Sequence, residues 1–523
     1  MTSRRTPSLL LALLLLAVSA MLDTTPVFAR AGGGHSYSGG HSRSSGGHSG
    51  SGGSRSGGGS RSRGGVVPIV PYSRPSYPSS PSSPGSAACG CVFLLVLLLV
   101  VALIVFLVVR AARAKGAASP PPPPPPPPTR GLEAIRDLDP DFSAVLFEDF
   151  VYVLYARAHE ARANPRDLEA LSPYLSAAVR GDLARREPAG VPVTAVVVGA
   201  LRVLDVALPA PGATPAQVMV WLEIESNVTE GTAGAAGHPG NAQTQYIRER
   251  WRLVRDAAAR TKPPVAVRTF PCPNCGAPFT SGSDRCEYCG EVVSGGRFDW
   301  SVEEAVVEAA EDRPPALTGT VEEEGTDLPT VVHPDLAERR AALLRDDPAA
   351  TDEALAARLK LIYDELQSGW TKLDLAPVRP FVSDGLFDYL QYWITAYQAQ
   401  GLRNVLVGMR VTRLELAKVV RDRWFDAVTF RVWGAGRDST VEQRTGRLVG
   451  GDPDHDRLYT EYWTLIRGAG VRGAPRADKS CPQCGAPLDT NMAGQCQHCG
   501  AKVTSGEFDW VLSKIEQDDS YTG

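Results

Sequence analysis

Two apolar stretches near the N-terminus differ in length and in their flanking residues. The first covers residues 9–20 without a charge, comes after Arg4 and Arg5, and precedes the small-residue pattern Val-Phe-Ala at residues 27–29. A short apolar run between basic residues and a small-residue site is typical of a secretory signal peptide, which we therefore assign to residues 1–29. An uncleaved membrane anchor is the alternative interpretation, and it gives the same topology.

The second apolar stretch, residues 92–109, contains eighteen consecutive apolar residues. At 1.5 Å per residue a helix of this length spans about 27 Å, which matches the hydrocarbon core of a bilayer. Arg110, Arg113 and Lys115 follow directly. Basic residues beside a membrane span mark its cytoplasmic end, so we predict a single transmembrane helix with all later residues in the cytoplasm.

Two segments around this helix have too few apolar residues to fold on their own. Residues 30–91 consist mainly of Gly, Ser, Pro and Arg with a few His, a composition typical of a disordered segment. Residues 119–130 include nine consecutive prolines, which favour a polyproline II rod of roughly 28 Å. Such a rod would hold the folded part of the chain away from the membrane surface.

From residue 131 onward the same series of motifs occurs twice. Residues 168–176 read Leu-Glu-Ala-Leu-Ser-Pro-Tyr-Leu-Ser, and residues 375–383 read Leu-Ala-Pro-Val-Arg-Pro-Phe-Val-Ser. Matched positions lie 207 to 212 residues apart, so the repeated unit is a whole domain. The other matched pairs are Val198-Gly199 with Val407-Gly408, Glu249-x-Trp251-x-Leu253 with Glu461-x-Trp463-x-Leu465, and Phe298-Asp299-Trp300 with Phe508-Asp509-Trp510.

Within each copy the apolar pattern predicts helices followed by strands. Residues 142–162 carry apolar side chains at helical spacing, and residues 352–370 do so in the second copy. A second helix is predicted after the Pro-aromatic step of each copy. This order indicates an α+β fold with the helices on one face of a bent antiparallel sheet. The predicted strands are at 193–207, 218–228 and 245–254, matched by 405–420, 424–433 and 458–466.

The charge distribution separates the two ends of the chain. Up to residue 129 there are eleven basic residues and one acidic residue, whereas from residue 130 onward 43 basic residues accompany 57 acidic ones. This asymmetry indicates that the two ends meet different environments. The acidic part has no stripe of Lys or Arg with interleaved aromatic residues, so we do not expect nucleic acid as a partner.

Eight of the ten cysteines form two sets of paired Cys-x-x-Cys doublets, one set in each copy. Ten residues separate the doublets of the first set and eleven separate those of the second, a spacing that lets four thiolates surround one zinc ion. A glycine follows each doublet, where the chain turns tightly and a positive φ is often needed. The predicted metal ligands are Cys272, Cys275, Cys286 and Cys289 in the first ribbon, and Cys481, Cys484, Cys496 and Cys499 in the second.

A closed shell of four thiolates leaves no coordination position for water or substrate, so each zinc ion should be structural. We therefore predict two structural zinc ions as cofactors and no catalytic residues. Thiol-disulfide exchange is the alternative, but a redox doublet would not need a second doublet in register. The Phe-Asp-Trp motif after each ribbon is expected to return the chain to its parent domain with the aromatic side chains buried. A peptide-binding role for its tryptophan is the other possibility.

These motifs give the chain a resemblance to a known family. The chain resembles the bacterial membrane proteins that carry a Tim44-like domain. The features that carry the resemblance are helices with a Pro-aromatic-Leu/Val step, a long first strand, a strand of the form Glu-x-Trp-x-Leu and an N-terminus with one predicted span. That domain is named after the matrix-side adaptor of the mitochondrial import translocase. The resemblance implies two cone-shaped domains of the nuclear transport factor 2-like fold, each with a pocket between sheet and helices. Zinc ribbons depart from the mitochondrial adaptor and are similar to those of bacterial members described as transport proteins.

These observations set the domain boundaries that we predict for the C-terminal part of the chain. The acidic segment between the two copies contains three prolines between residues 308 and 330 and is expected to be flexible. The predicted domains are a first Tim44-like domain at 131–264, the first zinc ribbon at 265–300, an acidic linker at 301–332, a second Tim44-like domain at 333–474, the second zinc ribbon at 475–510 and a tail at 511–523.

The family resemblance implies a non-enzymatic adaptor at the cytoplasmic face of the bacterial inner membrane. Its expected partner is a protein or a lipid, and its expected role is in protein transport or membrane protein assembly. An enzyme on the same cone fold is one alternative, because a fold alone does not fix a function. His159 and His455 do not correspond between the copies and Asp205 has no evident partner, so no catalytic set repeats. An envelope or metal sensor is the other alternative.

Overall fold

The computed structural model describes residues 131–523, apart from gaps at 188–189, 232–241, 265–268, 280–282, 313–316, 318–327, 477 and 519–520. The described residues belong to one compact unit of the chain. The predicted signal peptide, the segment 30–91, the predicted span at 92–109 and the proline linker at 119–130 lie outside the described residues. Among the helices that are described, none is long and apolar enough to cross a bilayer.

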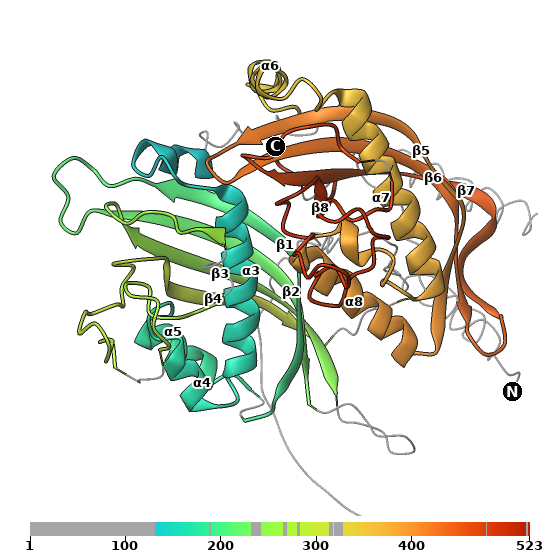
Figure 1. Cartoon of the computed structure of the whole chain (residues 1–523). Helices are drawn as coiled ribbons and strands as arrows, with labels where there is room; N and C mark the ends of the chain where they lie inside the picture. Colours follow the sequence, from blue (N-terminus) through green and yellow to red (C-terminus); the bar gives the residue numbers. More distant parts are fainter. Residues whose placement is uncertain are drawn as a thin grey trace, which may run out of the picture. The chain divides into compact units, whose positions relative to one another are not determined.

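Module 1, residues 131–311, begins with helices and ends with a sheet. The short helix η1 (Leu132–Asp137) precedes α3 (Ala144–Ala161), α4 (Pro165–Ala170) and α5 (Ala177–Ala184). In Figure 1 the long helix α3 lies across one face of the sheet, and buried side chains of α3 and of the strands form a common core. The strands pair antiparallel in sequence order: β1 (Val193–Ala207), β2 (Gln217–Glu230), β3 (Gln243–Asp256) and β4 (Ser301–Glu311).

Module 2, residues 328–523, repeats this arrangement. Its helical part contains α6 (Leu336–Asp346), α7 (Asp352–Lys372), η3 (Arg379–Phe381) and α8 (Asp384–Ala399). Four antiparallel strands again pair in sequence order: β5 (Leu402–Arg421), β6 (Phe425–Glu442), β7 (Leu448–Gly468) and β8 (Val511–Gln517). The order of helices before strands and the two antiparallel sheets confirm the predicted mixed architecture of helices and sheet.

Corresponding helices begin at side-chain caps in both modules. Ser143 caps α3 and Thr351 caps α7, and each hydroxyl accepts a hydrogen bond from the backbone N–H three residues later. Ser176 and Ser383 cap α5 and α8 in the same way. Such a cap satisfies a backbone N–H group that the first turn of a helix leaves unpaired. The repeated caps therefore start the helices at equivalent points of the two copies.

The fourth strand of each sheet comes after the ribbon, which corrects two predicted boundaries. The predicted linker at 301–332 begins with the eleven residues of β4, and the predicted tail at 511–523 begins with β8. Acidic and alanine residues have low strand propensity, which hides β4 in the sequence. The strand is stabilised by its basic neighbour: Glu304 Oε2 lies 3.2 Å from Arg252 Nε on β3.

The described C-terminal end of the predicted linker, residues 328–332, runs along the sheet of module 2. The Leu328 carbonyl accepts a hydrogen bond of 2.7 Å from Arg431 Nη1 on β6. The backbone N–H of Val331 donates to the Tyr462 hydroxyl on β7 at 2.9 Å. These residues are therefore bound to the second sheet, in contrast to the flexible linker that was predicted.

A buried ion pair beneath a tryptophan closes each module. In module 1 Arg255 Nη2 lies 2.9 Å from Asp139 Oδ2, and the guanidinium carbon lies 4.7 Å from the centre of the Trp300 ring. The three side chains are buried, and we call them the Asp–Arg–Trp lock. The lock of module 2 consists of Asp347, Arg467 and Trp510, with corresponding distances of 2.7 Å and 4.5 Å.

The lock explains the position of the Phe-Asp-Trp motif. Trp300 and Trp510 are buried, as predicted, and the residue after each tryptophan begins the fourth strand. Arg255 and Arg467 lie near the ends of β3 and β7, where the chain leaves the sheet for the ribbon. The lock therefore joins the point where each ribbon leaves the sheet to the point where it returns.

Replacing Arg467 by methionine should destabilise module 2 strongly. The substitution leaves Asp347 buried without its charge partner, and breaking one side of a buried pair costs about 3–5 kcal/mol. Arg340→Met is the matched control, because the pair of Arg340 with Asp352 is largely exposed and should contribute at most about 1 kcal/mol. Urea unfolding followed by hydrogen exchange in β7 would measure both losses. Equal losses in the two variants would show that the lock is not a structural constraint.

Candidate metal centres and a buried polar site

The four predicted ligands of ribbon 1, residues 265–300, come together in the structure. The Sγ atoms of Cys272 and Cys289 lie 3.9 Å apart, and so do those of Cys275 and Cys286. All four sulfur atoms lie within 4.8 Å of one another. Cys272 and Cys286 are buried, whereas Cys275 is exposed. The cluster could therefore hold one metal ion, partly open to solvent.

Ribbon 2, residues 475–510, forms an equivalent cluster. The Sγ atoms of Cys481 and Cys499 are 3.9 Å apart, and those of Cys484 and Cys496 are 4.0 Å apart. The four sulfur atoms again lie within 4.8 Å of one another. All eight sequence-predicted ligands are thus brought into two separate sets of four, each of which could hold a metal ion.

The sulfur separations fit a tetrahedral thiolate site. A Zn–S bond of about 2.3 Å gives sulfur–sulfur edges of about 3.8 Å in a regular tetrahedron. The separations across the doublets, 3.9 to 4.0 Å, agree with these edges. A disulfide would need about 2.05 Å between the sulfurs, and all eight cysteines are free thiols. The donor set and its geometry therefore suit a zinc ion.

Each doublet turns at a glycine with a left-handed backbone. Gly276, Gly290, Gly485 and Gly500 have φ values of 76°, 72°, 73° and 72°. Each glycine N–H donates to the carbonyl of the first cysteine of its doublet at 2.8 to 2.9 Å. A residue with a side chain rarely adopts this conformation, so these positions favour glycine, as predicted.

The thiols of ribbon 1 differ in acidity. Burial raises the pKa of Cys272 to about 12. The side-chain amide of Asn274 donates to Cys289 Sγ at 3.5 Å, and this hydrogen bond is the largest cause of a pKa lowered to about 7. A metal ion binds all four sulfurs as thiolates, so metal binding must release protons and weaken as the pH falls.

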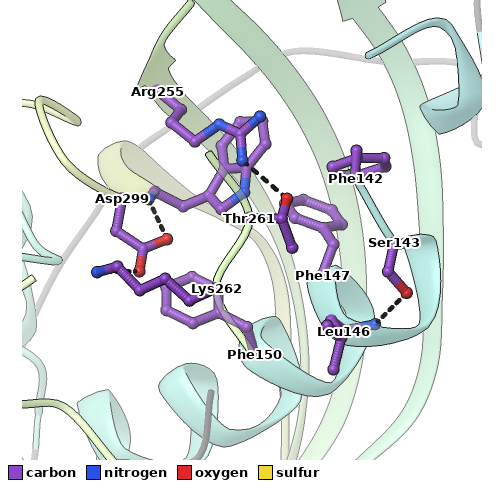
Figure 2. A pocket seen from close by; sticks show the side chains of 10 residues that line it. Phe142, Ser143, Leu146, Phe147, Phe150, Arg255, Thr261, Lys262 and Asp299 are labelled. Carbon is purple, nitrogen blue, oxygen red and sulfur yellow. Dashed lines mark hydrogen bonds and ion pairs between the residues drawn. The ribbon is translucent and has the colours of Figure 1, made fainter. Parts of the chain in front are cut away.

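A small pocket lies beside the lock of module 1 (Figure 2). Its volume is about 30 Å³, which is enough for about two water molecules. Lys262 Nζ and Asp299 Oδ2 form an ion pair of 3.0 Å along one wall. The pocket is therefore a small gap at the base of the ribbon. It is lined by Phe142, Ser143, Leu146, Phe147, Phe150, Arg255, Thr261, Lys262, Asp299 and Trp300.

The structure brings His159 to a partner that the sequence analysis missed. His159 on α3 and Glu249 on β3 are fully buried, with His159 Nε2 3.5 Å from Glu249 Oε1. Arg186 pairs with the same carboxylate oxygen, and Trp251 Nε1 donates to the other oxygen at 2.7 Å. The signal that could have revealed this site is the Glu-x-Trp motif, because alternate residues of a strand face the same side.

Burial is the largest influence on the pKa values of this pair. Burial lowers the pKa of His159, and Glu249 offsets that effect only in part, so the imidazole is neutral near pH 7. Burial alone would raise the pKa of Glu249, but His159, Arg186 and Trp251 together outweigh it and lower this pKa to about 2. A neutral imidazole beside a carboxylate resembles a general base, yet neither side chain is accessible to a substrate.

Module 2 keeps only part of this buried site. Gln367 stands at the position equivalent to His159, and Glu461 Oε2 accepts a hydrogen bond of 2.8 Å from Trp463 Nε1. The glutamate–tryptophan pair is thus shared, whereas the histidine is not. The other two residues that the sequence analysis considered lie on the surface: His455 is 2.8 Å from Asp452, and Asp205 is exposed.

One of the two modules matches a known protein family. Residues 336–475 match the family model described as "Tim44-like domain". This match covers module 2 from α6 to the end of β7 and leaves out the ribbon and β8. A search of curated proteins found no match. One solved structure, described as an "Ntf2 like protein involved in plasmid conjugation", matches this chain with 9% identity and a TM-score of 0.16. The match covers 72% of this chain and 95% of that chain.

The full chain is expected to bind two zinc equivalents, one at each cluster. Cys286→Ser should remove one equivalent and leave ribbon 2 intact, and Cys496→Ser should do the reverse, because the two sets share no ligand. Acidification should release the metal as thiolates become protonated. Elemental analysis of the purified chain and the two variants would measure this. Loss of both equivalents in either single variant would contradict two independent sites.

Replacing His159 by glutamine, its counterpart in module 2, should remove a pH dependence from module 1. Because the folded-state pKa of His159 is lowered, the unfolded chain binds the proton more tightly. Stability is therefore complete above the unfolded pKa of about 6.5 and falls as the pH drops below it, by at most about 1.4 kcal/mol per pH unit.

Hydrogen exchange of β3 between pH 7.5 and 5 would measure this dependence. The slope should be smaller in His159→Gln than in the natural chain. His455→Gln serves as the control, since His455 is exposed and should leave β3 unchanged. An unchanged slope in His159→Gln would assign the pH dependence to other groups.

Proposed function

We propose that this protein is a membrane-anchored, non-enzymatic adaptor with two Tim44-like domains at the cytoplasmic face of the bacterial inner membrane. The match of residues 336–475 to the Tim44-like domain carries this proposal. The domain's namesake is an adaptor of a protein-import translocase, which favours a role in protein transport or membrane protein assembly. The apolar run at 92–109 supports a single membrane span.

The similarity between the modules supports a second copy of the domain in module 1. Both modules have the same order of elements and the same order of strands. Both also repeat the helix caps, the Asp–Arg–Trp lock, the Glu-x-Trp motif and a four-cysteine insertion between the third and fourth strands. Separate origins would not place so many features at matching positions.

A structural role for two zinc ions is consistent with the cysteine geometry. Each set of four thiols fills the four positions of a tetrahedral ion, which leaves none for a substrate. The expected partner is a protein or a lipid, and the acidic composition after residue 130 disfavours nucleic acid.

An enzyme on the same fold is the second candidate, and the buried pair of His159 and Glu249 is the observation that favours it. The pair is closed to solvent, and its histidine has no counterpart in module 2. A buried ion pair that stabilises the core of module 1 explains the same contacts without catalysis. A sensor of the envelope or of a metal is a third candidate function for the same architecture.

If the two modules bind one partner together, removal of either module from the membrane-bound chain should lower the affinity for that partner about 10²-fold. The reason is that two linked sites gain affinity through effective concentration. Quantitative crosslinking and mass spectrometry would compare the full chain with chains lacking residues 131–311 or 328–523. One remaining zinc equivalent in each shortened chain would show that the other module is folded. His159→Gln, which copies Gln367 of module 2, should leave capture unchanged. Full capture by one module alone, or loss of function in His159→Gln with capture intact, would favour the enzyme.

A further inference from the structure

The two ribbons are fastened to their modules in different ways. We propose that ribbon 2 is a fixed part of module 2 that retains its metal, whereas ribbon 1 is an exchangeable metal site whose ion leaves without unfolding module 1. This inference rests on metal binding at both clusters. It goes beyond the proposed function, in which both ions are structural, because it makes the binding at one of the two centres reversible.

An ionic clamp holds ribbon 2 at the first residue of α8. The carboxylate of Asp384 accepts hydrogen bonds from Lys502 Nζ at 2.8 and 2.7 Å and from Thr504 Oγ1 at 3.1 Å, and it pairs with Arg379. Lys502 and Thr504 follow the second cysteine doublet of the ribbon by a few residues. Four charge-assisted contacts therefore meet at one carboxylate beside the metal cluster.

Arg379 carries the clamp into the ribbon from the other side. Its Nε donates to the Met492 carbonyl at 2.9 Å, and its Nη1 donates to the Val382 carbonyl of its own module at 3.1 Å. The guanidinium is buried and lies 4.7 Å from the centre of the Phe387 ring. It therefore joins the segment between the two doublets to the body of module 2.

The backbone of ribbon 2 lies directly against these groups. Gly494 has a φ of 74°, and a Cβ atom there would lie 2.2 Å from Thr504 Oγ1 and 2.8 Å from Arg379 Nη2. Only glycine leaves room for so close an approach. The ribbon is thus packed on the module around the clamp, and its second doublet is held in place even when one thiolate leaves the metal.

The repeat shows that ribbon 1 has no such clamp. The motifs align Arg379, Asp384, Lys502 and Thr504 with Ser172, Ala177, Val292 and Ser294 of the first copy. None of these four residues carries a charge. Ser172 is fully buried, and its hydroxyl oxygen has no hydrogen-bond partner among the described residues. The sequence itself therefore excludes the ionic clamp in module 1.

Ribbon 1 contacts module 1 at its first doublet and at the turn that leads into β4. At that turn the Gly296 carbonyl accepts a hydrogen bond of 2.8 Å from the Asp256 N–H, and the Gly295 carbonyl accepts one of 3.0 Å from Gln217 Nε2. The Tyr174 hydroxyl donates to the Pro271 carbonyl at 2.6 Å, and Lys262 Nζ donates to the Pro273 carbonyl at 2.5 Å. On the second doublet, Tyr288 is 71% exposed. Ribbon 1 is therefore joined to module 1 at both of its ends, but the four positions equivalent to the clamp carry no charge beside its second doublet.

This difference predicts different rates of metal release. When a thiolate dissociates from the ion, a clamped doublet stays close and rebinds, because preorganisation keeps its effective concentration high. A doublet without a clamp can move away and be captured by a competing ligand. Ribbon 1 should therefore release its metal first, while the lock keeps β4 in the sheet of module 1.

Metal release from the full-length chain loaded with two zinc equivalents would test the inference. With a chromogenic chelator in excess, we expect two kinetic phases of one equivalent each, the faster from ribbon 1. Cys286→Ser should abolish the fast phase, and Cys496→Ser should abolish the slow one. Hydrogen exchange after the fast phase should show β3 and β4 still protected.

Variants of the clamp supply a second, independent measurement. Lys502→Val, which copies Val292 of ribbon 1, should speed the slow phase about tenfold, and so should Arg379→Ser. Lys502→Val is the safer variant because Lys502 is partly exposed. Lys360→Val is the control: its exposed pair with Asp364 lies within α7, and both phases should stay unchanged.

Each outcome decides a separate question. Fewer than two bound equivalents in the natural chain would overturn the proposed pair of zinc sites. Three outcomes would leave zinc binding intact and overturn the proposed difference in metal release between the two ribbons. They are the release of both equivalents in a single phase, a fast phase that comes from ribbon 2, and a slow phase that neither clamp variant changes. Loss of β4 protection during the fast phase would show that ribbon 1 is as structural as ribbon 2.

Discussion

The pairing of one buried arginine with one buried aspartate is the constraint on which each module depends. Arg255 and Arg467 are almost completely buried, and a buried guanidinium is costly unless a carboxylate faces it. The carboxylates, Asp139 and Asp347, come from the segment before the first long helix of their modules, and the tryptophan over each guanidinium directly precedes the fourth strand. Three distant segments therefore meet at one charge, and a ribbon of some forty residues can be inserted without loosening the sheet.

The aspartate of the Phe-Asp-Trp motif shows how the two modules meet one requirement with different residues. Asp299 is paired by Lys262, which comes from the entrance to ribbon 1. At the same place in module 2, Arg358 from α7 lies 3.4 Å from Asp509 and also donates to the Trp510 carbonyl at 2.9 Å. Phe150 occupies the position of Arg358 in module 1 and lines the small pocket of Figure 2. The pocket of module 1 thus lies beside the Lys262–Asp299 ion pair, at the place where module 2 has the buried side chain of Arg358.

The sequence was sufficient for features that depend on local spacing and not for those that depend on pairing between distant residues. Cysteine spacing, the glycines after each doublet and the buried tryptophans are local, and the structure agrees with them. Strand β4 is Ala- and Glu-rich, so its local propensity is low and its antiparallel pairing with the distant strand β3 defines it. The partner of His159 lies ninety residues away on β3. The Glu-x-Trp motif indicates that Glu249 shares the face of Trp251, but no local pattern specifies that α3 places His159 against it.

The two similar modules allow an internal comparison that separates shared contacts from divergent ones. The lock, the caps and the glutamate–tryptophan pair occur in both modules. The histidine beside Glu249 and the clamp on Asp384 each occur in one copy only. Because both copies fold, neither of these can be a general requirement of the domain. Each instead changes one property of its own module: proton binding in the core of module 1, and the attachment of the metal ribbon in module 2.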